Sequence, residues 1–356
     1  MLAVRLANPQ SITISDWGEC YCSDNAKLQA AGLPGCCGKA RGAACVYGAN
    51  HSVVVYKTDL KTWSYEGVAL PLSARISGTE FRPCVIYNNQ TKKYLMWYED
   101  RHPGQQGYGI AASDTPVGPF ATVVNATGQT GGKIGDFDLL VDDDGKAYQV
   151  RTGNIIEQLT DDYLNGSGKF VSTLFFMSVR WIVFLGDKSV LCQRDLQGSL
   201  NLPKDSHGRS ILPGTEGPIF FKHGGNYYIT QGSGCCACKG GSSIYVFTAT
   251  APLGPFNYLG EIGTAPGSAG NASTCAAQND SDGLPGCVYT WRSQGTSSFT
   301  VGDTTVLLGN QWHTAGTPMG TGPRNKDLLY FAPLSFNGTA IERIRFQPTV
   351  TIPLPK

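Results

Sequence analysis

Carboxylates stand at the start of successive apolar hairpins in this chain. Glu80 precedes "RPCVIY", Asp136 precedes "LLVDDDG" and Glu216 precedes "PIFFK", while a fourth hairpin has Ser293 and Gln294 at the corresponding place. A single acid of this kind is ordinarily a solvated loop residue, but three at equivalent positions favour a shared site. Two carboxyl groups that converge across a depression can hydrolyse a glycoside. One donates a proton to the leaving oxygen, and another group activates water or stabilises the sugar cation.

The acids Asp142, Asp143 and Asp144 have a different setting. They lie in "VDDDGKAY", whose Asp-Gly pair between apolar flanks is the strongest hairpin signal in the chain. We therefore interpret them as turn residues without a catalytic role.

The elements that must position the acids are repeated. Apolar hairpins are predicted at 84–100, 138–153, 216–234 and 297–312, and a strand, polar turn and aromatic residue recur at 53–63, 110–120 and 245–256. The aromatic residues of the second unit, Trp63, Phe120 and Phe256, are expected to pack between sheets. Both units together make a four-stranded sheet, and radial repetition of such sheets predicts an all-β fold, a β-propeller. Its inner-strand ends surround one central depression, where the hairpin acids would converge.

Residues 173–213 interrupt this repeated pattern of strands. The segment fits no blade element and separates two hairpins that should be neighbours. We expect one propeller domain over residues 1–356, with 173–213 lying outside the blades.

Composition argues against nucleic acid and membrane as partners. Only 15% of residues are charged, the formal net charge is +1, and Lys and Arg are scattered along the chain rather than clustered. A nucleic-acid binder would normally show a basic face. The longest apolar run, 174–185, is too short to span a bilayer and contains Arg180.

Cysteines and glycosylation sequons indicate an oxidising compartment. The 12 cysteines favour disulfides over zinc, because paired Cys-x-x-Cys motifs are absent and the five His are distant. Cys235, Cys236 and Cys238 are expected to pair with loop cysteines such as Cys275 and Cys287. Seven sequons begin at Asn50, Asn89, Asn125, Asn165, Asn271, Asn279 and Asn337. We expect a secreted glycoprotein, although "MLAVRLANPQ" is not a convincing signal peptide, since Arg5 and Asn8 interrupt its apolar stretch.

The ordered motifs of the chain resemble glycoside hydrolase family 43, and most closely its exo-β-1,3-galactanase branch. The similar segments are "WGE" (17–19), "DLKTWSYEGVAL" (59–70), "RPCVIYNNQTKKYLMWYED" (82–100), "DFDLLVDDDGKAY" (136–148), "QLTDDYLNGSGKF" (158–170), "EGPIFFKHGGNYYI" (216–229), "APLGPF" (251–256), "SQGTSSF" (293–299) and "YFAPLSF" (330–336). The resemblance implies a five-bladed propeller and hydrolysis with inversion. Residues before Trp17 do not resemble the opening strand of the family, which leaves the completeness of the first blade open.

The resemblance also implies roles for individual residues. Glu216 matches the general acid, Asp136 the aspartate that tunes and orients it, and Gln294 the glutamine that holds the attacking water. An acid against the apolar run Pro218–Phe221 should have its ionised form disfavoured, which keeps a proton available near neutral pH. Glu80 corresponds to a sugar-binding glutamate, but here Phe81 separates it from Arg82.

Aromatic residues are the remaining candidates for substrate binding, because their faces stack on pyranose rings. These candidates are Trp17, Trp97, Tyr98 and Trp312, with Glu19 beside the first. For Trp97 and Tyr98 a place in the core is an equal alternative, given the strand alternation around them.

Three functions remain open from the sequence. The leading one is an inverting glycosidase acting on galactan-type polysaccharide, either β-1,3-galactan or arabinogalactan. The second is an α-L-arabinofuranosidase or β-xylosidase of the same family, for which Asp16 is the only, poorly placed, candidate base. The third is an inactive propeller that binds glycans. No cofactor or metal is predicted, a central calcium ion is left open, and the expected partner of the monomer is a poly- or oligosaccharide.

Overall fold

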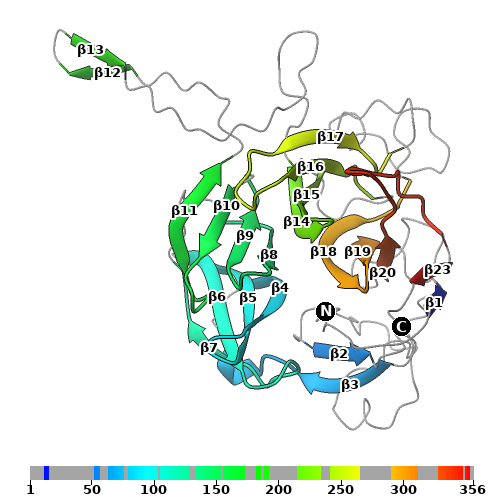
Figure 1. Ribbon diagram of the computed structural model, residues 1–356. Helices are drawn as coiled ribbons and strands as arrows, with labels where there is room; N and C mark the ends of the chain where they lie inside the picture. Colours follow the sequence, from blue (N-terminus) through cyan, green and yellow to red (C-terminus); the bar gives the residue numbers. More distant parts are fainter. Residues whose placement is uncertain are drawn as a thin grey trace, which may run out of the picture.

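The described strands form small antiparallel sheets arranged in a ring (Figure 1). The computed structural model describes residues 12–15, 52–56, 63–75, 79–102, 105–127, 134–153, 155–172, 182–185, 188–191, 215–233, 241–264, 290–311, 328–347 and 349–352, some of them by their backbone alone. Successive sheets follow the chain around a common axis. The predicted all-β propeller is therefore confirmed.

Four of these sheets are blades of three or four strands. They are numbered second to fifth in chain order, because a first blade is expected before them. The second blade contains β4 (Thr79–Asn88), β5 (Lys93–His102), β6 (Gln105–Ser113) and β7 (Ala121–Val124). The third contains β8 (Phe137–Val141), β9 (Ala147–Arg151), β10 (Ile155–Leu159) and β11 (Gly166–Ser172). The fourth contains β14 (Thr215–His223), β15 (Asn226–Ser233), β16 (Tyr245–Ala249) and β17 (Asn257–Glu261). The fifth contains β18 (Gln294–Val301), β19 (Thr304–Gln311) and β20 (Leu328–Pro333).

Shorter strands complete the described structure. They are the pairs β2 (Ser52–Tyr56) with β3 (Trp63–Val68), β1 (Ile12–Ser15) with β23 (Thr349–Ile352), β12 (Ile182–Leu185) with β13 (Lys188–Leu191), and β21 (Phe336–Asn337) with β22 (Ala340–Ile341). The β2–β3 pair occupies the sector where the first blade was expected (Figure 1). The β12–β13 hairpin, inside 173–213, pairs with none of the described blade strands. The described helical structure is one 3₁₀ turn, Leu72–Ala74, and no helix within the described ranges could cross a membrane.

The predicted Asp-Gly turn joins β8 to β9. Val141 pairs with Ala147, and the Gly145 amide donates to the Asp142 carbonyl at 2.9 Å. Gly145 has φ +80°, a left-handed conformation that glycine adopts without steric cost. Asp142 and Asp143 also bind Lys222 of the fourth blade, at 2.6 and 2.9 Å. Their roles in the described structure are those of turn and inter-blade contacts.

Hydrophobic side chains fill the spaces between adjacent blades. Side chains alternate along a strand, so a strand between two neighbours buries both of its faces. In β14, Phe220 belongs to the same hydrophobic cluster as Tyr148 of the third blade, whereas Phe221 belongs to the cluster that contains Leu307 of the fifth. Phe120 and Phe256, each 1% exposed, occupy such spaces as predicted, while the Trp63 side chain lies outside the described residues.

Two residues predicted as sugar platforms belong to this core. Trp97 and Tyr98 are both 0% exposed, and they face opposite sides of the second blade. The Trp97 indole packs near Phe137 and donates to the Tyr163 carbonyl at 3.0 Å. Since neither ring face is accessible, the platform interpretation is corrected for both residues and the core alternative applies.

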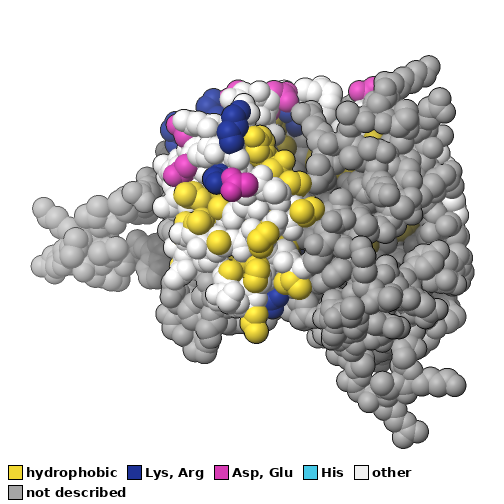
Figure 2. Space-filling model, turned by 90° about the horizontal axis from the view of Figure 1, so that it is seen from below, with side chains coloured by type: hydrophobic (Ala, Val, Ile, Leu, Met, Phe, Trp, Pro, Cys, Tyr) yellow, Lys and Arg dark blue, Asp and Glu magenta, His cyan; other side chains and the backbone are white. Residues whose placement is uncertain are grey.

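The outer surface near the second blade is mixed in character. Figure 2 shows exposed hydrophobic side chains beside charged side chains of both signs on this side of the molecule. The large exposed hydrophobic residues in the described ranges are Val68, Leu72, Tyr87, Val123 and Leu259.

Packing at Trp97 predicts a large effect on stability. Trp97→Ala should lower the free energy of unfolding by about 3–5 kcal/mol, because it removes a buried ring and leaves a cavity between two blades. Chemical denaturation measures this change. Val123→Ala, at a 52% exposed position, is the control and should change stability by less than about 0.5 kcal/mol. A Trp97→Ala protein of wild-type stability would contradict the core assignment.

Candidate active site

The innermost strands of the four blades meet around the axis. These strands are β4, β8, β14 and β18, with contacts between β4 and β8, β8 and β14, and β14 and β18 (Figure 1). The predicted acids lie at the starts of these strands, which places Asp136, Glu216 and Gln294 at the same end of the channel. Two layers of polar contacts connect the strands there.

The outer layer is centred on an ion pair between Arg82 and Asp136. Arg82 Nη1 lies 2.9 Å from Asp136 Oδ2, and the two side chains are 15% and 24% exposed. Arg82 Nη2 donates to the Thr296 carbonyl at 2.7 Å, so one guanidinium joins the second, third and fifth blades. Arg82 lies within a bulge of β4, between Phe81 and Cys84, and has φ +49°, an uncommon conformation for a residue with a side chain. Its side chain reaches Asp136 and the Thr296 carbonyl from this irregular backbone.

Asp136 also fixes the backbone beside Glu216. Its Oδ2 accepts a hydrogen bond of 3.1 Å from the amide of Gly217. A β-bulge between Glu216 and Ile219 frees this amide from the regular ladder. The Glu216 side chain is partly buried, and its Oε2 is shielded from solvent. Asp136 thus contacts the residue that directly follows the acid expected from the sequence.

Gly217 brings Gln294 into the same site. A Cβ built on Gly217 would lie 2.7 Å from the carbonyl oxygen of Gly295, so the backbones that follow Glu216 and Gln294 touch. Gly217 also has φ +59°, which favours glycine. Gln294 is 5% exposed. The structure thus brings together the chain segments that carry Asp136, Glu216 and Gln294, from three blades.

A second layer lies one step further along the channel and is centred on Asp138. Its Oδ2 accepts from the Phe220 amide at 3.0 Å, and its Oδ1 accepts from Ser297 Oγ at 3.0 Å and from the Cys84 thiol at 3.7 Å. Asp138 is 2% exposed, and burial raises its pKa to about 6 against the lowering effect of the Phe220 amide, the Ser297 hydroxyl, Arg82 and the Leu139 amide. Burial likewise raises the pKa of Cys84, which is a free thiol.

Sequence reasoning did not select Arg82 or Asp138. Both residues belong to segments that resemble family 43, and the sequence around each contains a feature that could have indicated its role. Asp138 is two residues after Asp136, so both side chains share one face of the strand. Arg82 is the cation nearest in sequence to the hairpin start of the second blade.

Other predicted residues are not part of the described site. The backbone of Glu80 pairs with that of Asp100 in the second blade, but its side chain lies outside the described residues. Trp17, Glu19 and Trp312 lie outside them too, as do Asp16 and the cysteines Cys235, Cys236, Cys238, Cys275 and Cys287.

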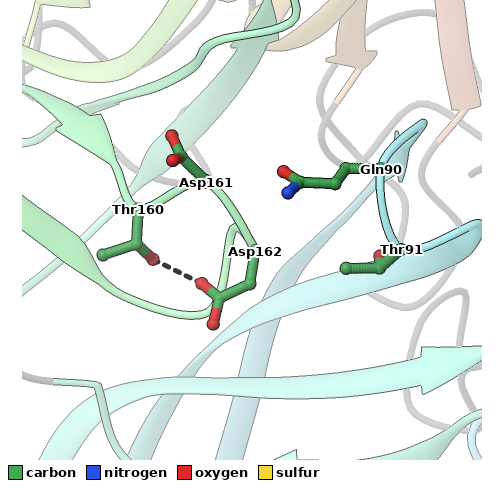
Figure 3. Close-up of a pocket in the computed structure, with 5 residues that line it drawn as sticks. All are labelled: Gln90, Thr91, Thr160, Asp161 and Asp162. Carbon is green, nitrogen blue, oxygen red and sulfur yellow. Dashed lines mark hydrogen bonds between the residues drawn. The ribbon is translucent and has the colours of Figure 1, made fainter.

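A surface cavity of about 270 Å³ lies apart from the two polar layers (Figure 3). It is lined by turn residues of the second and third blades, namely Gln90, Thr91, Thr160, Asp161 and Asp162. Asp162 turns toward Thr160, whose hydroxyl donates to it at 2.6 Å. Within the described ranges, no group of three or more His, Cys, Asp or Glu side chains is arranged to hold a metal ion.

Residues 48–318 match the family model "Glycosyl hydrolases family 43". The chain belongs to glycoside hydrolase family 43. No curated protein matches it in sequence.

Solved structures share the propeller of this family 43 protein at low sequence identity. The exo-β-1,3-galactanase from Phanerochaete chrysosporium, with galactose, has a TM-score of 0.57 and 20% identity over 85% of this chain and 57% of its own. The exo-β-1,3-galactanase from Clostridium thermocellum has a TM-score of 0.54 and 20% identity over 82% and 55%. A GH43 β-1,3-galactosidase has a TM-score of 0.56 and 19% identity over 83% and 52%. The chain therefore spans little more than half the length of these three proteins.

Titration of Asp138 predicts a pH dependence of stability. Its folded pKa of about 6 lies above the ordinary 3.8, so the folded state holds the proton more tightly than the unfolded chain. The free energy of unfolding should therefore fall as the pH rises from about 4 to about 6, by about 3 kcal/mol from this group. Asp138→Asn should lack this decline in denaturation series across pH. Ser297→Ala keeps the carboxyl but removes a donor to its ionised form, and should extend the decline to higher pH. An unchanged slope in Asp138→Asn would refute the assignment.

Close approach at Gly217 predicts a second measurable effect. Gly217→Ala should lower the free energy of unfolding by roughly 1–3 kcal/mol, since it adds strain at positive φ and a contact with the Gly295 carbonyl. Gly225→Ala is the matched control, because Gly225 has φ +79° but open space at its Cβ position. If both variants lost the same free energy of unfolding, the Gly295 carbonyl would lie farther from Gly217 than the structure shows.

Proposed function

We propose that this family 43 protein is an exo-acting glycosidase that hydrolyses galactan-type polysaccharide, β-1,3-galactan or arabinogalactan, with inversion. Family membership supports the reaction class, and the similarity in fold to galactanases supports the substrate class. The observation that carries the proposal is the contact of Asp136 with the Gly217 amide, which joins the two carboxyl-bearing strands.

Glu216 is the proton donor in this proposal. It directly precedes Gly217, whose amide Asp136 holds, and its Oε2 is shielded from solvent. The protonated carboxyl donates to the glycosidic oxygen as the bond to the anomeric carbon breaks, which removes the need to expel an alkoxide.

Asp136 is the positioning carboxylate. Arg82 compensates its charge, and the same Oδ2 holds the Gly217 amide. Loss of the Arg82 partner would leave a partly buried carboxylate without its compensating charge. We infer that Arg82 and Asp136 act as one unit that sets the orientation of Glu216.

Gln294 holds the attacking water. A neutral amide oxygen accepts a hydrogen bond from water on the face of the sugar opposite to the acid. The water adds its oxygen to the anomeric carbon and loses a proton to solvent, which gives the inverted hemiacetal. An inverting site needs room for this water between its two functional groups.

We also propose that the protein is secreted and N-glycosylated. The sequon residues Asn89, Asn125, Asn165 and Asn337 are exposed on the described surface, where a glycan could be attached.

The proton-donor role predicts a dependence on the leaving group. Glu216→Gln should lower kcat on β-1,3-galactobiose, a poor leaving group, by about 10²–10⁴-fold, because proton donation is lost. On an aryl β-galactoside with an acidic phenol the loss should be much smaller, since that group departs with little protonation. Galactose release and the released phenol measure the two rates.

Glu342→Gln, at an exposed position of the same residue type, is the control and should keep wild-type rates on both substrates. Equal losses of Glu216→Gln on both substrates would show that Glu216 is not the donor. Wild-type hydrolysis of arabinofuranosides or xylosides alone would favour the second activity within the family. Glycan binding without any product would favour an inactive propeller.

A further inference from the structure

Asp138 is a buried carboxylate that the proposed reaction does not use. It belongs to β8, yet it accepts hydrogen bonds from β14, β18 and β4, through the Phe220 amide, the Ser297 hydroxyl and the Cys84 thiol. Each of these strands carries a residue of the outer layer a few positions earlier: Glu216, Gln294 and Arg82. A single side chain therefore touches every inner strand on which the candidate site is built.

The two layers have the same plan. In both of them an aspartate, Asp136 immediately before β8 or Asp138 within it, accepts from an amide of β14 and from a donor of β4, and the outer layer is joined to β18 through Arg82. The two aspartates are two residues apart, roughly 7 Å for an extended chain. A shift of one inner strand at Asp138 would therefore be transmitted to the outer layer over a short distance.

A carboxylate suits this position because it is an acceptor with two oxygens. It can receive several N–H, O–H and S–H donors at once, which no apolar side chain does. Burial of such a group costs free energy unless it is hydrogen-bonded, and hydrophobic residues of similar volume often stabilise a core better. The presence of a carboxyl at a 2% exposed position therefore indicates a role in geometry rather than in stability alone.

We propose that Asp138 is a positioning residue, whose carboxyl holds β4, β14 and β18 in register against β8 and thereby aligns Glu216 and Gln294 with Asp136. The charged and titratable groups that face it are Arg82 and Cys84 of β4, while β14 and β18 contribute the Phe220 amide and the Ser297 hydroxyl. This inference rests on the proposed glycosidase activity for its kinetic readout only.

The kinetic test compares Asp138→Ala, Asp138→Asn and Glu157→Gln in the full chain. Asp138→Ala removes all three contacts, and it should lower kcat on β-1,3-galactobiose about 10- to 100-fold while KM changes less than about 3-fold, as small misplacements of catalytic groups do. Asp138→Asn can accept from the Phe220 amide and donate to Ser297, so it should restore kcat to within a few-fold of wild type.

Glu157→Gln is the matched control. Glu157 is also a buried carboxylate, 0% exposed and paired with Arg151 at 3.0 Å, but it lies on β10 away from the channel. Glu157→Gln should lower the melting temperature of the protein. At temperatures below the unfolding transition it should leave kcat unchanged. An equal loss of kcat in Glu157→Gln and Asp138→Ala, at matched stability, would show that Asp138 contributes stability only.

A structural readout separates this inference from the proposed function. In a crystal structure of Asp138→Ala, the Asp136–Gly217 hydrogen bond and the contact of Arg82 with the Thr296 carbonyl should lengthen beyond hydrogen-bond distance, with blade interiors unchanged. Persistence of both contacts at 3.1 and 2.7 Å would overturn the inference, whatever the activity. If wild type and Glu157→Gln release no galactose, the proposed function fails, and this structural result alone decides the role of Asp138.

Discussion

The ion pair between Arg82 and Asp136 is the interaction on which the site depends. It joins the second blade to the third, and through the carbonyl of Thr296 it reaches the fifth. Asp136 then holds the amide next to Glu216. Hydrogen bonds to charged groups contribute about 1.5–3 kcal/mol each, more than neutral ones, and the partial burial of both side chains limits screening by water. Geometry at the channel is therefore set by charge-assisted contacts.

Hydrophobic packing has a different role in this propeller. Full burial of a Val, Leu, Ile, Phe or Met side chain stabilises the folded state by about 1.5–3 kcal/mol, and each space between blades contains many such residues. Hydrophobic burial is not directional, so it does not set the relative positions of the inner strands to within a fraction of an ångström. The polar layers of Asp136 and Asp138 supply the direction, since a hydrogen bond weakens steeply with angle and distance. Stability and alignment thus come from separate parts of the fold.

Two residues with left-handed backbone conformation, Arg82 and Gly217, explain how the starts of the inner strands approach so closely. Gly217 and Arg82 both have positive φ and both adjoin β-bulges, which release an amide or redirect a side chain toward the axis. Regular strands would direct these groups into their own sheets. The irregular strand starts therefore create the site, while regular pairing further along each strand maintains the blades.

The sequence by itself determined the all-β repeat, the Asp142–Gly145 turn, the packing of Phe120 and Phe256, and the candidates Asp136, Glu216 and Gln294. The repeat, the turn, the aromatic packing and the acids Asp136 and Glu216 follow from local patterns of alternation and turn residues, whereas the role of Gln294 follows from the resemblance to family 43. The tertiary structure alone decided that Trp97 and Tyr98 are core, because a propeller strand buries both faces and alternation then marks no exposed side. It also revealed Arg82 and Asp138, whose partners Thr296 and Ser297 are 214 and 159 positions away. Contacts across such separations depend on how blades meet, and no local pattern encodes that.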